Sequence, residues 1–180
     1  NKHSHFNLAN IVTFFNISCG IFAIYFLTHD EFMGAALFAW LAGAFDIFDG
    51  KIARKYNLST EFGIQLDSYA DFLSFVIVPA MFIYFAIFDG KESFYNMALI
   101  AFVFIYYVIS GLRRLIQFNI NANEGEVEKY FTGIPTPLGA ILLWVVYLIY
   151  LTDYVNEYFV LGSIIIIGYL LNSKIKIKHL

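Results

Sequence analysis

Four aspartates within a short stretch of an apolar chain are the residues best suited to do chemistry. Asp46, Asp49, Asp67 and Asp71 lie in the segment DIFDGKIARKYNLSTEFGIQLDSYAD, between two strongly apolar runs. An ionised carboxylate near lipid is costly, by a few kcal/mol or more. Because the basic side chains of this segment do not balance four carboxylates, we expect a pair of divalent metal ions to supply the missing positive charge.

The spacing of the aspartates predicts two facing pairs. Asp46 and Asp49 stand at positions i and i+3, and Asp67 and Asp71 at i and i+4, so each pair occupies one face of a helix. A short polar connection joins the two helices, which we expect to pack as an antiparallel pair with converging carboxylates. Oxygen ligands of this kind suit hard cations such as Mg²⁺, Mn²⁺ or Ca²⁺.

Small residues on the same two faces indicate a bulky ligand beside the metal ions. Gly50, Ala53 and Gly63 leave space there, and Arg54 is placed to hold a phosphate through a bidentate pair of hydrogen bonds. Two other interpretations remain open. The aspartates are either surface carboxylates paired with Lys and Arg at helix ends, or part of an ion or proton pathway in a transporter.

The elements that position these residues are membrane helices, because the composition excludes an ordinary soluble domain. Hydrophobic residues make up 60% of the 180 residues and charged residues 14%, against about 45–50% and about 25% in soluble domains. The net charge of −3 gives no indication of nucleic-acid binding. The single cysteine, Cys19, excludes a disulfide framework and a zinc cluster.

Six apolar runs predict six transmembrane helices in one catalytic domain over residues 1–180. Lipid offers the backbone no hydrogen-bonding partner, so runs of this length must be helical. We therefore expect an all-α integral membrane protein. The runs are Leu8–Leu27, Phe32–Ile52, Phe62–Phe88, Phe94–Phe118, Ile134–Leu151 and Val155–Leu171, with a polar connection at Asn119–Gly133.

The basic residues predict the orientation of these helices. With six spans, every basic residue except Lys91 falls on the side that holds both termini. Positive charge marks the cytoplasmic side, so we expect cytoplasmic termini and an aspartate cluster that faces the cytoplasm from the cytoplasmic membrane. The residues on that side are Lys2, Lys51, Arg54, Lys55, Arg113, Arg114, Lys129, Lys174, Lys176 and Lys178.

The aspartate segment resembles the signature of the CDP-alcohol phosphotransferase family. It reads D-x2-D-G-x2-A-R-x8-G-x3-D-x3-D and matches that signature at every fixed position. The resemblance implies six transmembrane helices, with the signature spanning the second and third. It also implies transfer of a phosphatidyl-type group from a CDP-linked lipid to a small alcohol, with release of CMP, and a homodimer.

The same resemblance implies roles for the individual residues. Two divalent cations, Mg²⁺, Mn²⁺ or Ca²⁺, would be held by Asp46, Asp49 and Asp67. Asp71 would contact the second metal and act as the general base. Gly50, Ala53, Arg54 and Gly63 would line the site for the cytidine and the diphosphate.

Two later segments point to the acceptor alcohol. GLRRLIQFN (Gly111–Asn119) and FTGIPTPLGA (Phe131–Ala140) resemble segments of the phosphatidylserine synthase branch, although Gln117 replaces the last Arg of the usual run. The carboxylate of an amino-acid acceptor needs a cation. The residues that we expect to bind it are Arg113, Arg114, Asn119, Thr132 and Thr136.

Each of these segments also has a simpler interpretation. The arginine pair is typical of a positive-inside anchor at a helix end. Pro135 and Pro137 are typical of the first turn of a helix.

The expected reaction is therefore transfer from CDP-diacylglycerol or CDP-archaeol to L-serine. The nearest alternative keeps the chemistry and takes glycerol 3-phosphate or an inositol phosphate as the acceptor. An alternative of another class is a transporter without enzymatic activity, which would move ions or solutes and release no CMP.

Overall fold

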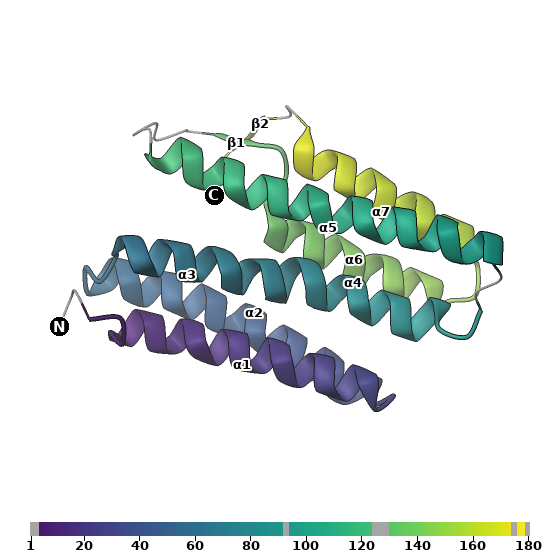
Figure 1. Cartoon of the computed structure of the whole chain (residues 1–180), viewed down its shortest axis with the longest axis horizontal. Coiled ribbons are helices and arrows are strands. Elements are labelled where there is room, and N and C mark those ends of the chain that lie inside the picture. Colours follow the sequence, from purple (N-terminus) through teal and green to yellow (C-terminus); the bar gives the residue numbers. More distant parts are fainter. Residues whose placement is uncertain (1–3, 92–93, 124–129, 174–175, 179–180) are drawn as a thin grey trace. The chain divides into compact units, whose positions relative to one another are not determined.

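The computed structural model describes residues 4–91, 94–123, 130–173 and 176–178. The chain forms two compact units, Asn1–Phe82 and Ile83–Leu180, and each is described by itself. Helices dominate both units, as the apolar runs predicted (Figure 1).

The first unit holds the two helices that carry the aspartate segment, together with the helix before them. These are α1 (Leu8–Thr28), α2 (Phe32–Lys55) and α3 (Glu61–Asp71). Asn7 caps α1 by accepting a hydrogen bond from the Asn10 amide, and Thr60 caps α3 by accepting one from the Gly63 amide. Helix α1 packs along most of α2 and also against α3, whereas α2 and α3 meet each other at few points (Figure 1).

A π-helical segment follows immediately after Asp71. This segment, η1 (Phe72–Ile77), is followed by α4 (Val78–Ile83). The Val78 amide donates to the Leu73 carbonyl, one residue further back than in an α-helix. Pro79 has no amide hydrogen, so the wider turn falls where a regular helix would lose a hydrogen bond. Single π turns inside helices are frequent at functional sites.

The second unit holds the later helices and a short sheet. Its helices are η2 (Tyr84–Phe88), α5 (Phe94–Asn123), α6 (Thr136–Tyr150) and α7 (Glu157–Asn172), and α7 packs against both α5 and α6. Strands β1 (Tyr130–Thr132) and β2 (Lys176–Lys178) pair antiparallel, with Phe131 opposite Ile177.

Two details of this unit differ from the sequence-based expectation. The polar connection was expected to begin at Asn119, but α5 continues to Asn123. The short β1–β2 sheet was not expected in an all-α chain. A helix can continue into polar residues beyond its apolar run, so the end of the run does not mark the end of the helix. Strands of three residues arise from tertiary pairing and leave no pattern in the sequence.

Gly133 allows the chain to enter α6 beside the end of α7. Its φ is +81°, in the region that favours glycine. A Cβ at this position would lie 2.6 Å from the Leu171 carbonyl oxygen, a distance that no side chain tolerates. The next amide, that of Ile134, donates to the Leu170 carbonyl at 3.1 Å. The segment before α6 is therefore fixed on the C-terminal turn of α7.

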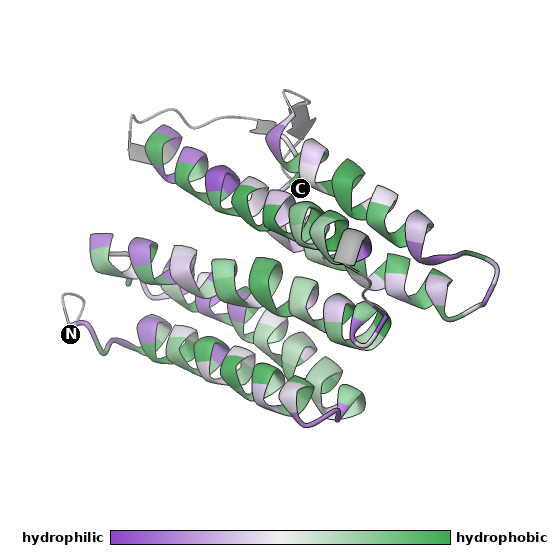
Figure 2. Cartoon of the chain, turned by 45° about the vertical axis from the view of Figure 1, so that its right-hand side comes forward, coloured by the Kyte–Doolittle hydropathy of each residue, from purple (hydrophilic) through white to green (hydrophobic). Residues whose placement is uncertain are grey.

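Among the residues that the structure describes, four helices are long and apolar enough to cross a membrane. They cover Leu8–Thr28, Phe32–Lys55, Glu61–Phe88 and Asn96–Asn121, and the apolar helices α6 and α7 are shorter. Figure 2 shows hydrophobic residues along most of each helix. The chain is therefore an integral membrane protein by the length and composition of its helices.

Candidate metal centre and adjoining cavity

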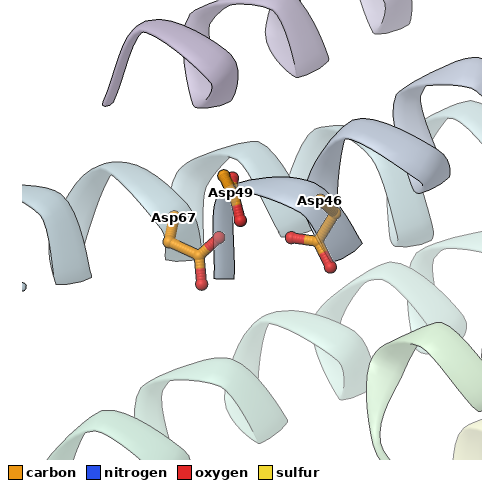
Figure 3. Close-up of side chains that lie close together, drawn as sticks. All are labelled: Asp46, Asp49 and Asp67. Carbon is orange, nitrogen blue, oxygen red and sulfur yellow. The ribbon is translucent and has the colours of Figure 1, made fainter. Parts of the chain in front are cut away.

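Three aspartates from two helices converge in the first unit. Asp46 and Asp49 project from α2 and Asp67 from α3, and one carboxylate oxygen of each lies within 4.8 Å of the others (Figure 3). Asp49 is buried, with 5% of its surface exposed, and the other two are half-buried. The structure therefore brings together carboxylates that stand far apart in the sequence.

Asp71 lies one helical turn beyond Asp67 and belongs to the same cluster. The Asp46 carboxyl is within hydrogen-bonding reach of both Asp67 and Asp71. Asp46 is thus the carboxylate of α2 that faces both acids of α3. Asp71 lies outside the compact group of three oxygens, deeper along the helix and directly before the π turn.

The donor atoms of this cluster fit a divalent cation. One oxygen of Asp67 and one of Asp71 are buried, and neither has a hydrogen-bond partner within the described part of the chain. Oxygens that share one Mg²⁺ or Ca²⁺ ion lie at most about 4–5 Å apart, twice the metal–oxygen distance. The three converging carboxylates meet this limit, and their uncompensated negative charge is what a cation would neutralise.

Helix α1 supplies polar contacts to the site that the sequence did not predict. The Thr13 hydroxyl donates to Asp49 Oδ2 at 2.7 Å, and Asn16 accepts a hydrogen bond from the Ser74 hydroxyl. Asn7 donates to the Leu58 carbonyl at 3.4 Å, in the connection between α2 and α3. The sequence does contain a pattern that points to these contacts, because polar residues recur at every third position from just before the first apolar run into its first half. They are Asn7, Asn10, Thr13 and Asn16.

A cavity of about 110 Å³ adjoins the carboxylates. Three of the four residues predicted to line the CDP site, Gly50, Ala53 and Gly63, line it. The whole lining is Ala9, Asn10 and Thr13 of α1, Asp49, Gly50 and Ala53 of α2, Leu58, Ser59 and Thr60 of the connection, and Gly63, Ile64 and Asp67 of α3.

Two glycines of this cavity differ in how closely they are packed. A Cβ at position 63 would lie 2.9 Å from Asn10 Oδ1 and 3.2 Å from Thr60 Oγ1, so Gly63 allows α3 to approach α1. A Cβ at position 50 would meet only the Arg54 guanidinium, at 3.6 Å. The exposed Arg54 side chain therefore folds back over Gly50, at the side of the cavity.

The residues predicted to bind the acceptor lie in the second unit. Arg113 is exposed and donates to Asn172 Oδ1 at 3.0 Å, whereas Arg114 is buried and its Nε donates to the Ile134 carbonyl at 3.3 Å. Thr136 is buried at the start of α6, Asn119 lies in the last turns of α5, and Thr132 lies in β1. The aspartates and their cavity belong to the first unit.

The prolines of this segment have the helix-start role that the sequence indicated. Pro135 is the N-cap of α6 and Pro137 falls in its first turn, where the missing amide hydrogen leaves no bond unmade. Arg114 fixes the carbonyl of the residue before Pro135. The buried arginine thus has a structural contact at the entry to α6.

The cluster, the cavity and the membrane helices define an integral membrane protein whose acidic site fits a divalent cation. The chain belongs to the CDP-alcohol phosphatidyltransferase family, because the model of that family matches residues 6–171. This confirms the family indicated by the aspartate signature.

Comparison with individual proteins shows which named enzymes the chain is similar to. The chain is 31% identical over 170 residues to a CDP-diacylglycerol–serine O-phosphatidyltransferase of Bacillus subtilis, covering 94% of this chain and 88% of the relative. It is 33% identical over 170 residues to one of Methanocaldococcus jannaschii, covering 94% and 72%. It is 30% identical over 171 residues to an archaetidylserine synthase of Methanothermobacter thermautotrophicus, covering 94% and 68%.

Proposed function

We propose that this protein transfers a phosphatidyl-type group from a CDP-linked lipid to the hydroxyl of L-serine and releases CMP. The observation that carries the proposal is the convergence of Asp46, Asp49 and Asp67 beside a cavity lined by the small residues of the same signature. The names of the relatives support serine as the acceptor.

The cavity is the proposed nucleotide site. Its volume of about 110 Å³ is below the roughly 300–1,000 Å³ that encloses a drug-sized ligand, so it suits one part of the CDP group rather than the whole lipid. Gly50, Ala53 and Gly63 give the ligand close access to the backbone. Arg54 lies over Gly50, at the side of the cavity where a diphosphate would need a cation.

The aspartates are proposed to hold two divalent cations, Mg²⁺ or Mn²⁺, with Ca²⁺ as a further possibility. Asp46, Asp49 and Asp67 would be the first ligands, and Asp71 would reach the second ion. When bound, the cations neutralise the diphosphate and the charge that develops on the leaving CMP. The protein contributes the fixed spacing of the carboxylates on α2 and α3.

Asp71 is the proposed general base. A serine hydroxyl keeps its proton at neutral pH, so a carboxylate has to accept it as the hydroxyl attacks phosphorus. Asp71 lies one turn further along α3 than Asp67, and one of its oxygens has no hydrogen-bond partner within the described residues. That oxygen is available to receive the proton.

Replacing Asp71 separates this role from substrate binding. We expect Asp71→Asn to lower turnover by roughly 10²–10⁴-fold, the range for loss of a general base, while binding of the CDP-lipid largely survives. Product formation and the retention of labelled CDP-lipid would be measured on the same preparation. Unchanged turnover would contradict the assignment of the base.

The acceptor site is proposed to use Arg113 or Arg114 with Asn119, Thr132 and Thr136. Arg113 is the stronger candidate for the serine carboxylate, because its guanidinium is exposed and bonded to a neutral amide. Arg114 is buried and bonded to a main-chain carbonyl. A phosphorylated acceptor would need a denser basic cluster than this pair.

The proposal includes a membrane arrangement. The six apolar runs of the sequence support six spans, and the basic residues support cytoplasmic termini and a cytoplasmic active site in the cytoplasmic membrane. The family resemblance supports a homodimer. The lipid is CDP-diacylglycerol or its ether analogue CDP-archaeol, since the relatives include synthases named for both kinds of product.

One assay tests the reaction and its acceptor. Purified protein would receive CDP-diacylglycerol or CDP-archaeol, Mn²⁺ or Mg²⁺, and labelled serine, glycerol 3-phosphate or inositol phosphate in separate reactions. We expect labelled lipid and CMP with serine. Labelled lipid from another acceptor alone would overturn the choice of serine. The absence of CMP release with every acceptor would favour the transporter.

A further inference from the structure

Helix α1 connects the two helices that carry the aspartates. It packs along α2 and against both α3 and η1, whereas α2 and α3 have few contacts with each other. The relative position of the two carboxylate pairs therefore depends on α1 rather than on direct packing between α2 and α3.

Buried polar side chains make this connection specific. Asn7, Asn10, Thr13 and Asn16 are all at most 4% exposed. Three residues turn an α-helix by about 300°, so successive members of this row face different neighbours. Thr13 contacts α2 through Asp49, and Asn16 contacts η1 through Ser74, one turn beyond Asp71.

The Thr13 hydroxyl holds one proton with two acceptors in reach. Asp49 Oδ2 lies at 2.7 Å and the carbonyl of Ala9, in the preceding turn of α1, at 3.1 Å. A hydrogen bond to an ionised carboxylate is about twice as strong as one between neutral groups, so the proton is directed to Asp49. This bond restrains the Asp49 carboxylate through Oδ2.

We propose that Thr13 is a positioning residue for a divalent cation, and that it acts by fixing the orientation of the Asp49 carboxylate. This inference rests on the proposed use of metal ions. Partners that orient a ligand are as much a part of a metal site as the ligand itself, and their loss typically lowers metal affinity or activity by about 10–100-fold. Thr13 would therefore set metal affinity without binding the metal.

The test compares three variants of α1. Thr13→Val keeps the shape of the side chain and removes the hydroxyl, and Thr13→Ser keeps the hydroxyl. Ser18→Ala is the matched control, because the Ser18 hydroxyl bonds only to the carbonyl of Phe14 in its own helix among the described contacts. Thr13→Ala is a second variant without the hydroxyl, for use if Thr13→Val does not fold.

Binding of Mn²⁺ would be titrated by electron paramagnetic resonance on the purified full chain, without any lipid substrate. We expect Thr13→Val to weaken Mn²⁺ binding by roughly 10–100-fold, with Thr13→Ser and Ser18→Ala within about threefold of the original protein. The KM for CDP-lipid would be measured at saturating Mn²⁺ on the same variants.

Three results would overturn the inference. The first is a Thr13→Val variant that binds Mn²⁺ as the original protein does. The second is a Thr13→Ser variant as weak as Thr13→Val, which would assign the effect to shape. The third is a raised KM for CDP-lipid with unchanged Mn²⁺ affinity, which would make Thr13 a nucleotide contact. An original protein that binds no Mn²⁺ would overturn the proposed metal use together with this inference.

Discussion

Two clusters of ionisable side chains in this chain differ in how their charge is balanced. In the first unit, Asp46, Asp49, Asp67 and Asp71 gather four carboxyl groups at the converging faces of α2 and α3. In the second unit, Lys91 donates to Glu157 at 3.0 Å and to the Tyr150 hydroxyl at 3.0 Å.

The second cluster is complete by itself. The Tyr150 hydroxyl also donates to Glu157 at 2.9 Å, so the cation, the anion and the phenol form a closed set of hydrogen bonds. The Lys91 and Glu157 side chains are 52% and 40% exposed, and water shares in their solvation. The aspartates are more buried, and within the described residues no Lys or Arg forms an ion pair with them. The comparison therefore favours a cationic ligand at the aspartates.

The largest expected effect comes from removing a carboxylate of the unbalanced cluster. We expect Asp67→Asn to lower turnover by about 1,000-fold or more, because several kcal/mol of charge stabilisation are lost with the metal. Glu157→Gln is the matched control, since it makes the same change in the balanced cluster. We expect it to stay within about twofold in the serine transfer assay.

Equal losses in Asp67→Asn and Glu157→Gln would contradict the distinction between the two clusters. Mn²⁺ titration of both variants would show whether the loss lies in metal binding.

A smaller effect is expected from filling space beside the aspartates. Gly63→Ala would press on Asn10 and Thr60 at 2.9 and 3.2 Å, so α3 has to move away from α1. Overpacking of this kind costs about 1–3 kcal/mol. We expect a lower thermal midpoint and a raised KM for CDP-lipid.

Gly50→Ala is the control within the same cavity, because its added methyl would meet only the flexible Arg54 side chain. We expect its thermal midpoint to match that of the original protein. A Gly50→Ala variant that is destabilised as much as Gly63→Ala would contradict the packing described for α1 and α3.

The smallest effect is expected at Lys91. Hydrogen bonds to Tyr150 and then Glu157 raise the pKa of Lys91 above its usual 10.5. A raised pKa contributes stability that is complete below pH 10.5 and is lost as the pH rises through the higher value. Thermal midpoints of Lys91→Gln and the original protein should therefore differ by a small, constant amount between pH 6 and 9 and converge only above that range.

The sequence predicted the aspartate pairs because two independent constraints agreed there. Helices are obligatory in lipid, and the i, i+3 and i, i+4 spacings then place each pair on one face. The expected direct packing of α2 on α3 was less accurate, because α1 makes most of the contacts. Which helix packs against which depends on how the three helices share one interface. The spacing of residues within each helix does not specify this arrangement.

Other features of the fold and of the site were harder to predict from the sequence. The role of α1 depended on uncharged residues such as Thr13, and these attract less attention than ionised groups in an apolar run. The π turn after Asp71 falls just before Pro79, and a proline in a helical run does not by itself specify a π turn. The acceptor residues were chosen from motifs, and only their burial and hydrogen bonds separate the exposed Arg113 from the buried Arg114.

The buried polar side chains of α1 have a consequence for the biosynthesis of the protein. Helix α1 precedes α2 and α3 in the chain, so Thr13 and Asn16 enter the membrane before Asp49 and Ser74 have been synthesised. The Thr13 hydroxyl has the Ala9 carbonyl of its own helix as an acceptor in the meantime, but the donor to the Asn16 side-chain oxygen, the Ser74 hydroxyl, comes 58 residues later. The polar contacts of the first unit are therefore completed only when the helix that carries Ser74 has been inserted, and a nascent chain arrested before Ser74 lacks the donor to the Asn16 oxygen.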